Sequence, residues 1–334
     1  MGKTNLLEAI YYLCMTKSPA GLNDRHLALH EQSFFRLEGH FTSEHLPQKI
    51  VAKVVPGKSK VMECNDVAYE KLSQHIGLLP VVMIAPDDTA LLTGASEDRR
   101  RLMDNVLSQL SPDYLRNLLL YNNLLQQRNA ALKQMAASGQ YNELLLETYE
   151  HRMEPAAQVI FQHRQSWEQQ LLPYFLDYYR DISGGAEMPG LLYQSQLQQQ
   201  PLADWWRQHR EKDRILHRTS AGVHRDDVLF SLDGQEIKRF ASQGQLKSFL
   251  LALKLAQYEL LRAQKKRPPL LLLDDIFDKL DPHRVKHLLT LLVERSYGQI
   301  FLTDTDEDRV ARIAGELNTD YQAFKIANGH AQQQ

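Results

Sequence analysis

The sequence predicts an α/β fold that is interrupted by a largely helical second lobe. A helical pattern follows a Gly-Lys-Thr at residues 2–4, and a run of four leucines ends in two aspartates at 274 and 275. Between these ends, roughly 110 residues repeat apolar side chains at helical spacing. A short apolar run that ends in carboxylates is typical of a buried parallel strand. The two ends of the chain therefore predict an α/β lobe, and the middle predicts a helical insertion.

The first part of the chain, residues 1–95, predicts a helix followed by a small antiparallel sheet. Apolar residues recur at helical spacing over residues 5–15, directly after the Gly-Lys-Thr. Over residues 33–69 the apolar period changes to two, and a Pro-Gly-Lys-Ser turn separates two of the alternating runs.

The second part, residues 96–210, carries a helical period through long segments rich in Leu, Gln and charge, which is typical of helices that pack as a bundle or hairpin. The third part, residues 211–334, predicts a return to α/β structure. Its expected elements are a hairpin around Asp233-Gly234, a helix from Ser242 to about residue 265, a strand over 269–275, a helix from Pro282, a strand over 299–304, a further helix and a last strand over 323–327.

The composition is that of a globular protein. Hydrophobic residues make up 43% of the 334 residues and charged residues 24%, and the formal charge of −2 leaves room for a local basic surface. Cys14 and Cys64 stand alone, so we expect buried or idle thiols in a reducing compartment. There is neither a signal-peptide pattern nor an apolar run of ~18 residues. We expect a soluble cytoplasmic protein without a membrane partner.

The first motif is the stretch Gly2, Lys3, Thr4 and Asn5, which matches the end of a phosphate-binding loop. In such a loop the N–H groups of a helix N-terminus surround phosphate, the lysine reaches the β- and γ-phosphates, and the threonine hydroxyl binds Mg²⁺. The full motif has another glycine five residues before Gly2, ahead of Met1. The alternative is an ordinary helix start.

The second motif is Leu-Leu-Leu-Leu-Asp-Asp-Ile-Phe-Asp-Lys-Leu-Asp, at residues 270–281. Ligands bind at the carboxyl edge of α/β sheets, so we expect Asp274 to hold Mg²⁺ through water and Asp275 to orient or deprotonate an attacking water. The alternative makes the two aspartates simple strand-end residues and Asp281 the N-cap of the helix that begins at Pro282.

The third motif is Ser-Gln-Gly-Gln at residues 242–245. Ser242 and Gln245 have the spacing of a capping box. Gly244 is unfavourable inside a first helical turn, yet it suits a backbone that a ligand must approach closely. A helix N-terminus with a serine hydroxyl is an anion site, and the alternative is a helix that is only capped.

Taken in their order along the chain, the motifs at 2–5, 242–245 and 270–281 resemble the Walker A, the signature, and the Walker B and D-loop sequences of ABC-type ATPases. The resemblance implies an ABC-type P-loop ATPase head with a mixed sheet, and ATP and Mg²⁺ as cofactors. It implies an ATP-dependent homodimer in which the signature helix of one subunit closes on the nucleotide of the other. The ATP-binding residues it implies are Gly2, Lys3, Thr4, Asn5, Ser242, Gly244, Gln245 and Asp281.

The same resemblance assigns the metal and catalytic residues. Thr4 and Asp274 would hold Mg²⁺, and Asp275 is the catalytic residue in place of the commoner glutamate, which implies slow hydrolysis. The sequence departs from the usual Ser-Gly-Gly-Gln by one glycine. Thr303 or Thr305 stands where many relatives have a switch histidine.

Other segments are similar to the RecF family, in the SMC-like branch of these ATPases. The similar segments cover essentially the whole chain and include residues 99–104, 127–133 and 222–234. Val223 departs from the family, where many members have proline. Val82 and Met83 stand where many ABC proteins have a Mg²⁺-sensing glutamine. Because family members carry a further strand and a glycine-rich loop upstream, we expect that Met1 lies inside the phosphate loop.

The resemblance to RecF implies ATP-dependent binding to DNA at single-strand/duplex junctions, with RecO and RecR as partners, and a weak DNA-stimulated ATPase. The candidate phosphate contacts are basic residues on the helical lobe: Arg99, Arg100, Arg101 and Arg128. Lys133 and residues 265–267 are further candidates, and the alternative is that all these residues are solvated helix ends. In the His-Arg-Asp-Asp segment, residues 224–227, we expect Arg–carboxylate pairs, with a direct nucleotide role for His224 or Arg225 as the alternative.

Two other functions fit the motifs without DNA binding. One is a nucleotide-switched scaffold that does not hydrolyse ATP, and the other is a transporter motor subunit, against which the long helical insertion argues. A nuclease-linked relative is disfavoured because no acidic metal domain follows the last strand.

Overall fold

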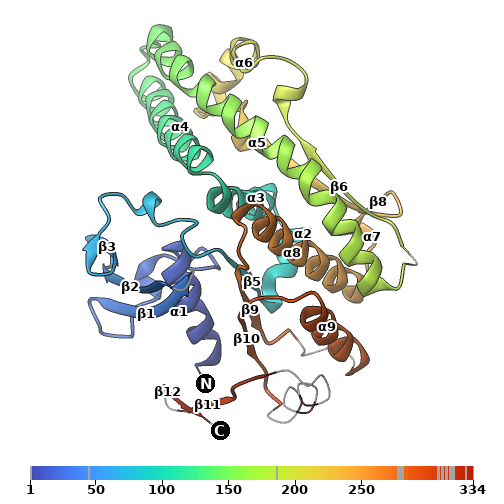
Figure 1. Cartoon of the computed structure of the whole chain (residues 1–334). Coiled ribbons are helices and arrows are strands. Elements are labelled where there is room, and N and C mark those ends of the chain that lie inside the picture. Colours follow the sequence, from blue (N-terminus) through green and yellow to red (C-terminus); the bar gives the residue numbers. More distant parts are fainter. Residues whose placement is uncertain are drawn as a thin grey trace. The chain divides into compact units, whose positions relative to one another are not determined.

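The computed structural model describes residues 2–43, 46–185, 187–276, 282–306, 309, 312, 315, 320–327 and 329–333 (Figure 1). The chain forms two compact units. The first, called here the nucleotide unit, consists of residues 1–88, 178–185 and 250–334. The second, called the helical unit, consists of residues 89–177 and 186–249. Among the described residues, no helix combines the length and apolar character that a membrane crossing requires.

The nucleotide unit is built around helix α1 (Lys3–Met15). The apolar side of α1, which includes Leu7 and Tyr11, packs into one core with the antiparallel sheet and with the parallel sheet. The antiparallel sheet has the order β1-β2-β3-β4, and its strands are β1 (Phe35–Ser43), β2 (Leu46–Val55), β3 (Ser59–Cys64) and β4 (Val67–Ala68). The predicted first helix and the predicted antiparallel sheet are therefore confirmed.

The parallel sheet of the nucleotide unit has the order β10-β9-β5. Its strands are β5 (Val81–Ile84), β9 (Leu270–Asp274) and β10 (Ile300–Thr303). β9 is the central strand, with a neighbour on each side, and Leu271, Leu272 and Leu273 are fully buried while Leu270 is half-buried. Val82 and Met83 are core residues of β5, a strand that the apolar pattern did not single out.

The remaining elements of the nucleotide unit are short, except helix α9 (Pro282–Glu294). The short elements are η1 (Asp24–His26), η2 (Leu72–Gln74), η3 (Pro86–Thr89), which runs into the helical unit, β11 (Phe324–Ala327) and β12 (His330–Gln333). β11 and β12 pair as an antiparallel hairpin. This confirms the strand predicted over 323–327, but β12 follows it, so it is not the last strand. The helix predicted between the strands at 299–304 and 323–327 lies mostly outside the described residues.

The helical unit contains α2 (Ala90–Thr93), α3 (Ser96–Leu110), α4 (Pro112–Ser138) and α6 (Leu202–Leu216). It also holds η4 (Gln196–Gln198), η5 (Val223–Arg225) and α7 (Ile237–Phe240). Two helices continue from one unit into the other, α5 (Glu143–Ser183) and α8 (Gln243–Lys265). The long helical periods predicted over the middle of the chain are confirmed in α3, α4 and α5.

A small antiparallel sheet also belongs to the helical unit, with the order β6-β7-β8. It is formed by β6 (Pro189–Gln194), β7 (Asp227–Leu232) and β8 (Gln235–Glu236). β6 lies inside the stretch predicted to be helical, and the hairpin that follows β7 continues as the single turn α7. The short strand was missed because six residues between polar segments carry too little period to mark it.

The boundaries of the two units differ from the three parts predicted from the sequence. The helical unit includes residues 89–95 and 211–249, which the sequence assigned to the ATPase lobe. Pairing explains the difference, because β7 forms its register with β6 and not with the parallel sheet. The three-part division remains a prediction about domains.

Candidate phosphate and metal site

The N-terminus of α1 is shaped to receive an anion. Gly2 is the N-cap residue and has a φ of 108°, in the left-handed region that favours glycine. Its carbonyl accepts the N–H of Leu6 at 3.2 Å, and no acidic side chain occupies the first turn of α1. The first N–H groups of a helix lack partners within the helix and carry the positive end of its dipole. Asn5 is exposed in this same turn.

The carboxyl ends of β9 and β10 bring an acidic cluster to the start of α1. Thr4 Oγ1 donates to Asp274 Oδ1 at 3.1 Å, and Thr303 Oγ1 donates to the same oxygen at 2.7 Å. The N–H of Asp275 donates to Thr303 Oγ1 at 3.0 Å. Residues 4, 274 and 303, far apart in the sequence, therefore meet because two parallel strands end at one edge.

The ammonium group of Lys3 points to the same sheet edge. Lys3 Nζ donates to the backbone carbonyl of Asp304 at 2.5 Å, and Arg309 Nε lies 3.4 Å from the Asp304 carboxylate. Asp304 directly follows β10. The two residues that a phosphate loop requires, Lys3 and Thr4, thus lie over the ends of the two strands that carry the acids.

The donor set at this edge suits Mg²⁺. A hydroxyl oxygen of Thr4 and a carboxylate oxygen of Asp274 converge here, 3.1 Å apart, and oxygens of these kinds are the ligands that Mg²⁺ prefers, directly or through water. The described residues contain no group of three or more His, Cys, Asp or Glu side chains that could hold a metal. Mg²⁺ is commonly bound through one or two protein groups and completes its sphere with phosphate and water, and Thr4 and Asp274 offer that number of oxygens here.

Electrostatics at the edge favour a cation. Glu8 lies one turn after Thr4 on α1, and both burial and the nearby Asp274 carboxylate raise its pKa. Asp274 is itself 4% exposed. Negative charge that is held close together in a poorly solvated place is stabilised by a bound cation.

The Ser-Gln-Gly-Gln motif forms the start of α8, in the helical unit. The Ser242 N–H donates to Gln245 Oε1 at 2.7 Å, and the Gln245 N–H donates to Ser242 Oγ at 3.2 Å. The predicted capping box is therefore confirmed. Gln245 Nε2 also donates to Glu187 at 2.7 Å, while Gly244 is exposed in the first turn. Asp281, the remaining residue predicted to bind ATP, lies outside the described residues.

The sequence identified most of this site but missed what Thr303 does. It named Thr303 only as a candidate for a switch position, whereas the structure places its hydroxyl between Asp274 and Asp275. Thr303 is also the register partner of Asp274 in the parallel pair. Aligning the ends of the two apolar strand sequences would have found this pairing.

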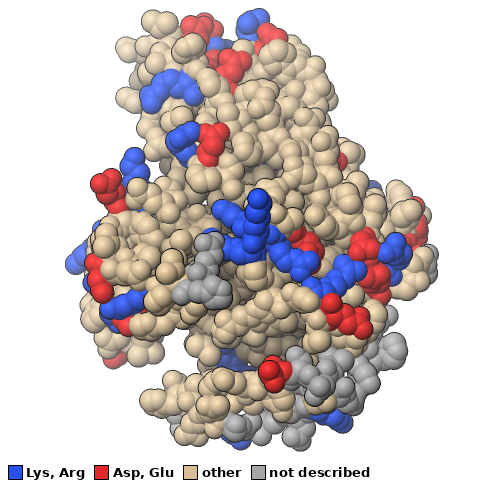
Figure 2. Space-filling view, in the orientation of Figure 1, with Lys and Arg blue, Asp and Glu red and all other residues tan. Residues whose placement is uncertain are grey.

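The four arginines predicted to contact DNA occupy different surroundings. Figure 2 shows basic and acidic side chains interspersed over the face that it draws. Arg99 donates through Nε and Nη2 to the Asp227 carboxylate, at 2.6 and 2.9 Å. Arg100 donates to the Asp226 carbonyl at 2.7 Å. The side chain of Arg101 is 39% exposed, with Asp98 as its nearest partner at 3.4 Å. The side chain of Arg101 is thus more exposed than that of Arg99, 11%, and its ion pair is longer.

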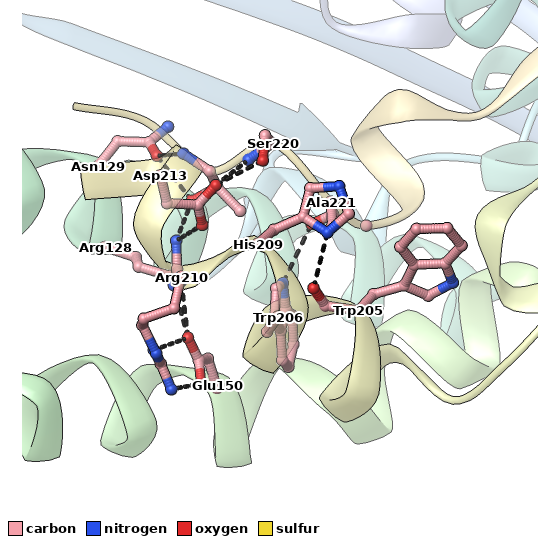
Figure 3. Close-up of polar contacts among 12 residues, drawn as sticks. Arg128, Asn129, Glu150, Trp205, Trp206, His209, Arg210, Asp213, Ser220 and Ala221 are labelled. Atoms are coloured by element: carbon pink, nitrogen blue, oxygen red, sulfur yellow. Dashed lines mark hydrogen bonds and ion pairs between the residues drawn. The ribbon is translucent and has the colours of Figure 1, made fainter. Parts of the chain in front are cut away.

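Arg128 contradicts its predicted role as a DNA contact. It is 0% exposed, and Figure 3 shows it enclosed by residues of α5 and α6. Its guanidinium donates to Glu150, to Asp213 and to Thr219, at 2.6, 2.8 and 2.8 Å. A DNA phosphate cannot reach a guanidinium that is fully buried and already paired with the carboxylates of Glu150 and Asp213. Arg128 is therefore a structural residue of the helical unit.

The other basic candidates divide in the same way. Lys133 and Lys266 are exposed. Arg267 donates through Nη2 to the carbonyls of Gly77 and Leu78, at 3.0 and 2.5 Å, so it closes a loop near the end of α8. Arg267 is thus half-buried against a distant loop and is not the solvated helix end of the alternative interpretation.

The His-Arg-Asp-Asp segment forms the predicted Arg–carboxylate pairs, with arginines from other elements. Asp226 is 1% exposed and accepts from Arg164 at 2.7 Å and from the Tyr193 hydroxyl at 2.6 Å. Asp227 accepts from Arg99. These pairs tie α3 and α5 to β7, whereas Arg225 is exposed.

His224 is held in its neutral form by neighbours within the helical unit. The Thr219 carbonyl accepts from Nε2 at 3.1 Å, so Nδ1 accepts from the Tyr121 hydroxyl at 2.8 Å. Burial lowers the pKa of His224 to about 4, and the charges of Arg225, Arg100 and Arg128 act in the same direction. These contacts favour a structural role over the alternative nucleotide role.

We expect stability to fall in acid through His224. The unfolded chain binds a proton near pH 6.5 that the folded chain resists until about pH 4, so the free energy of unfolding should drop by about 3 kcal/mol between these values. Urea unfolding at pH 7 and pH 4 should therefore show a smaller drop for His224→Gln than for the wild type. His30→Gln is the control, because the His30 side chain is 97% exposed. Equal drops in all three proteins would contradict this assignment.

The fold and the site define a class of protein. A glycine-capped helix that carries Lys and Thr, set over a parallel sheet whose strands end in aspartates, is the arrangement of a P-loop ATPase head. The Smc head domain of Pyrococcus furiosus, in complex with part of ScpA, shares the fold, with a TM-score of 0.52 at 14% identity over 99% of this chain and 86% of that chain. The chain has the fold of a P-loop ATPase head of the ABC and SMC type.

Comparison with known proteins then identifies the family. DNA replication and repair protein RecF of Parabacteroides distasonis is 40% identical over 332 residues, which cover 99% of this chain and 90% of the relative. RecF of Porphyromonas gingivalis is 40% identical over 331 residues, 98% of this chain and 90% of the relative. The chain belongs to the RecF family. No family model matches it.

Solved RecF structures agree with this assignment. The recombination mediator protein RecF with ATP, described as part of the RecFOR pathway, superposes with a TM-score of 0.89 at 25% identity, over 100% of this chain and 88% of that chain. A second RecF structure, described with the ligand ATPrS, gives a TM-score of 0.87 over 99% of this chain and 89% of that chain.

Proposed function

We propose that the chain is an ATP-dependent DNA-binding recombination mediator of the RecF type. It acts at single-strand/duplex junctions in DNA repair and replication restart, with partners of the RecO and RecR type. ATP joins two copies, and slow hydrolysis reopens the dimer. The observation that carries the proposal is the meeting of Lys3 and Thr4 with Asp274 and Thr303 at one sheet edge.

Each residue of this edge has a defined task in the proposal. The N–H groups at the start of α1 hold the β-phosphate, and Lys3 moves from the Asp304 carbonyl to the β- and γ-phosphates. Thr4 and Asp274 hold Mg²⁺, which neutralises charge that develops on the phosphates. Asp275 orients and deprotonates the attacking water.

The helical unit supplies the remaining parts. The capped start of α8, with Ser242 and Gly244, closes on the nucleotide of a second copy, where exposed N–H groups and a hydroxyl meet the γ-phosphate. Arg101 is the arginine that we propose for a phosphate contact with DNA, since its three companion candidates are engaged within the unit.

The test is fluorescence anisotropy of a labelled gapped duplex, with and without ATP and Mg²⁺ at fixed salt. The protein is expressed from the chromosomal reading frame, so that any residues encoded ahead of Met1 are included. We expect ATP-dependent binding, and a salt slope that falls by about one when Arg101 is replaced by glutamine. Arg116→Gln is the matched control, since Arg116 is a more exposed arginine, 76%, of the adjacent helix. A folded protein that binds ATP but does not bind DNA would contradict the DNA-binding proposal.

A further inference from the structure

A single hydroxyl group links the two aspartates of the phosphate and metal site. Thr303 ends β10 beside Asp274, its register partner on β9. Its Oγ1 donates to Asp274 Oδ1 at 2.7 Å and accepts the N–H of Asp275 at 3.0 Å. One side chain on a neighbouring strand thereby contacts the carboxylate of the first aspartate and the backbone of the second.

The backbone of Asp275 needs such support. Its φ is 44°, in the left-handed region that a residue with a Cβ seldom adopts. A conformation of this kind persists where surrounding contacts hold it, and it is common at catalytic positions. The bond from the Asp275 N–H to Thr303 is one such contact, and it sets the direction in which the Asp275 side chain leaves the strand.

The position of the Asp274 carboxylate depends on the same hydroxyl. Oδ1 of Asp274 accepts from Thr4 at 3.1 Å as well as from Thr303. A hydroxyl has two lone pairs and one proton, so Thr4 would offer a lone pair to Mg²⁺ while its proton still faces Asp274, and Asp274 Oδ1 would remain held from α1 and from β10. The bond from Thr303 approaches from the neighbouring strand, so it helps to keep the carboxylate oriented.

We propose that Thr303 is a positioning residue for ATP hydrolysis, which orients Asp274 toward Mg²⁺ and Asp275 toward the attacking water. The inference rests on the proposed function. It also differs from a switch role on the γ-phosphate. A hydroxyl carries one proton, and Thr303 donates that proton to Asp274, so it has none left for a phosphate oxygen. Thr305, the other candidate for the switch position, is exposed beyond the end of β10.

The test compares Thr303→Val, which removes the hydroxyl at constant shape, with Thr303→Ser, which keeps it. For the valine variant we expect kcat to fall, and the Mg²⁺ concentration for half-maximal activity to rise, each by about 10-fold or more. ATP affinity without Mg²⁺ should stay within about 2-fold, because Lys3 and the start of α1 are untouched. Thr303→Ser should recover most of both losses, and Thr305→Val is the control.

A second measurement needs no nucleotide. The peptide that carries Asp275 should exchange its amide hydrogens faster in Thr303→Val than in the wild type, since the acceptor of that N–H is removed. Wild-type kinetics and exchange in Thr303→Val, or equal losses in the serine and valine variants, would overturn the positioning role. A folded wild type that neither binds nor hydrolyses ATP would instead overturn the proposed function, so the two failures are distinguishable.

Discussion

Replacement of Asp275 by asparagine is expected to lower kcat for ATP hydrolysis by about 100-fold or more, with little change in ATP affinity. Asparagine has the shape of aspartate but cannot take a proton from water, and a positioned general base contributes about 10²–10⁴-fold. Lys3, Thr4 and Asp274, which we propose for phosphate and Mg²⁺, remain in place. The change therefore separates hydrolysis from binding.

Phosphate release under single-turnover conditions measures the loss, and ATP-dependent dimerisation is followed in parallel by light scattering. We expect the variant to dimerise with ATP as well as the wild type, and to stay dimeric longer. Asp87→Asn is the control, because Asp87 is an exposed carboxylate of the same unit. If turnover is already negligible in the wild type and unchanged in the variant, the chain is a nucleotide-switched scaffold and Asp275 is not catalytic.

Replacement of Arg128 by methionine is expected to lower the free energy of unfolding by about 3–5 kcal/mol. Removal of one partner from a buried ion pair leaves an uncompensated charge, and this costs more than the pair itself contributes. Here the change would leave the buried Asp213 of α6 without its arginine and would remove one of the two arginines that pair with Glu150 of α5 (Figure 3). Asp213 also accepts from Ser220 at 2.6 Å, and Arg210 pairs with Glu150, so the loss reaches the whole cluster.

Urea unfolding at neutral pH measures this loss. Arg116→Met is the matched control on α4, because its side chain is 76% exposed and such surface changes stay within about 0.5 kcal/mol. The opposite result would be an Arg128→Met variant that keeps wild-type stability but binds DNA more weakly and with a smaller salt slope. That result would support the predicted contact between Arg128 and a DNA phosphate, and would contradict the structural role.

Much of the local structure followed from the sequence alone. The start of α1 after Gly2, the buried strand β9 and the capped start of α8 are each determined by residues within a few positions of one another. The helical period, the apolar runs and the spacing of capping residues are local patterns, so they can be interpreted without knowing which elements pack together. The order of the three motifs also sufficed to indicate the class of protein.

The tertiary structure decided which of several similar residues does what. Arg101 and Arg128 look alike in sequence, yet the first is partly exposed and the second is buried against Glu150 and Asp213. Thr303 gained its place only because β10 pairs in register with β9. The role of a polar side chain depends on the charge and burial that distant segments bring to it. The charge and burial around a side chain depend on how the whole chain packs, so no local pattern in the sequence predicts them.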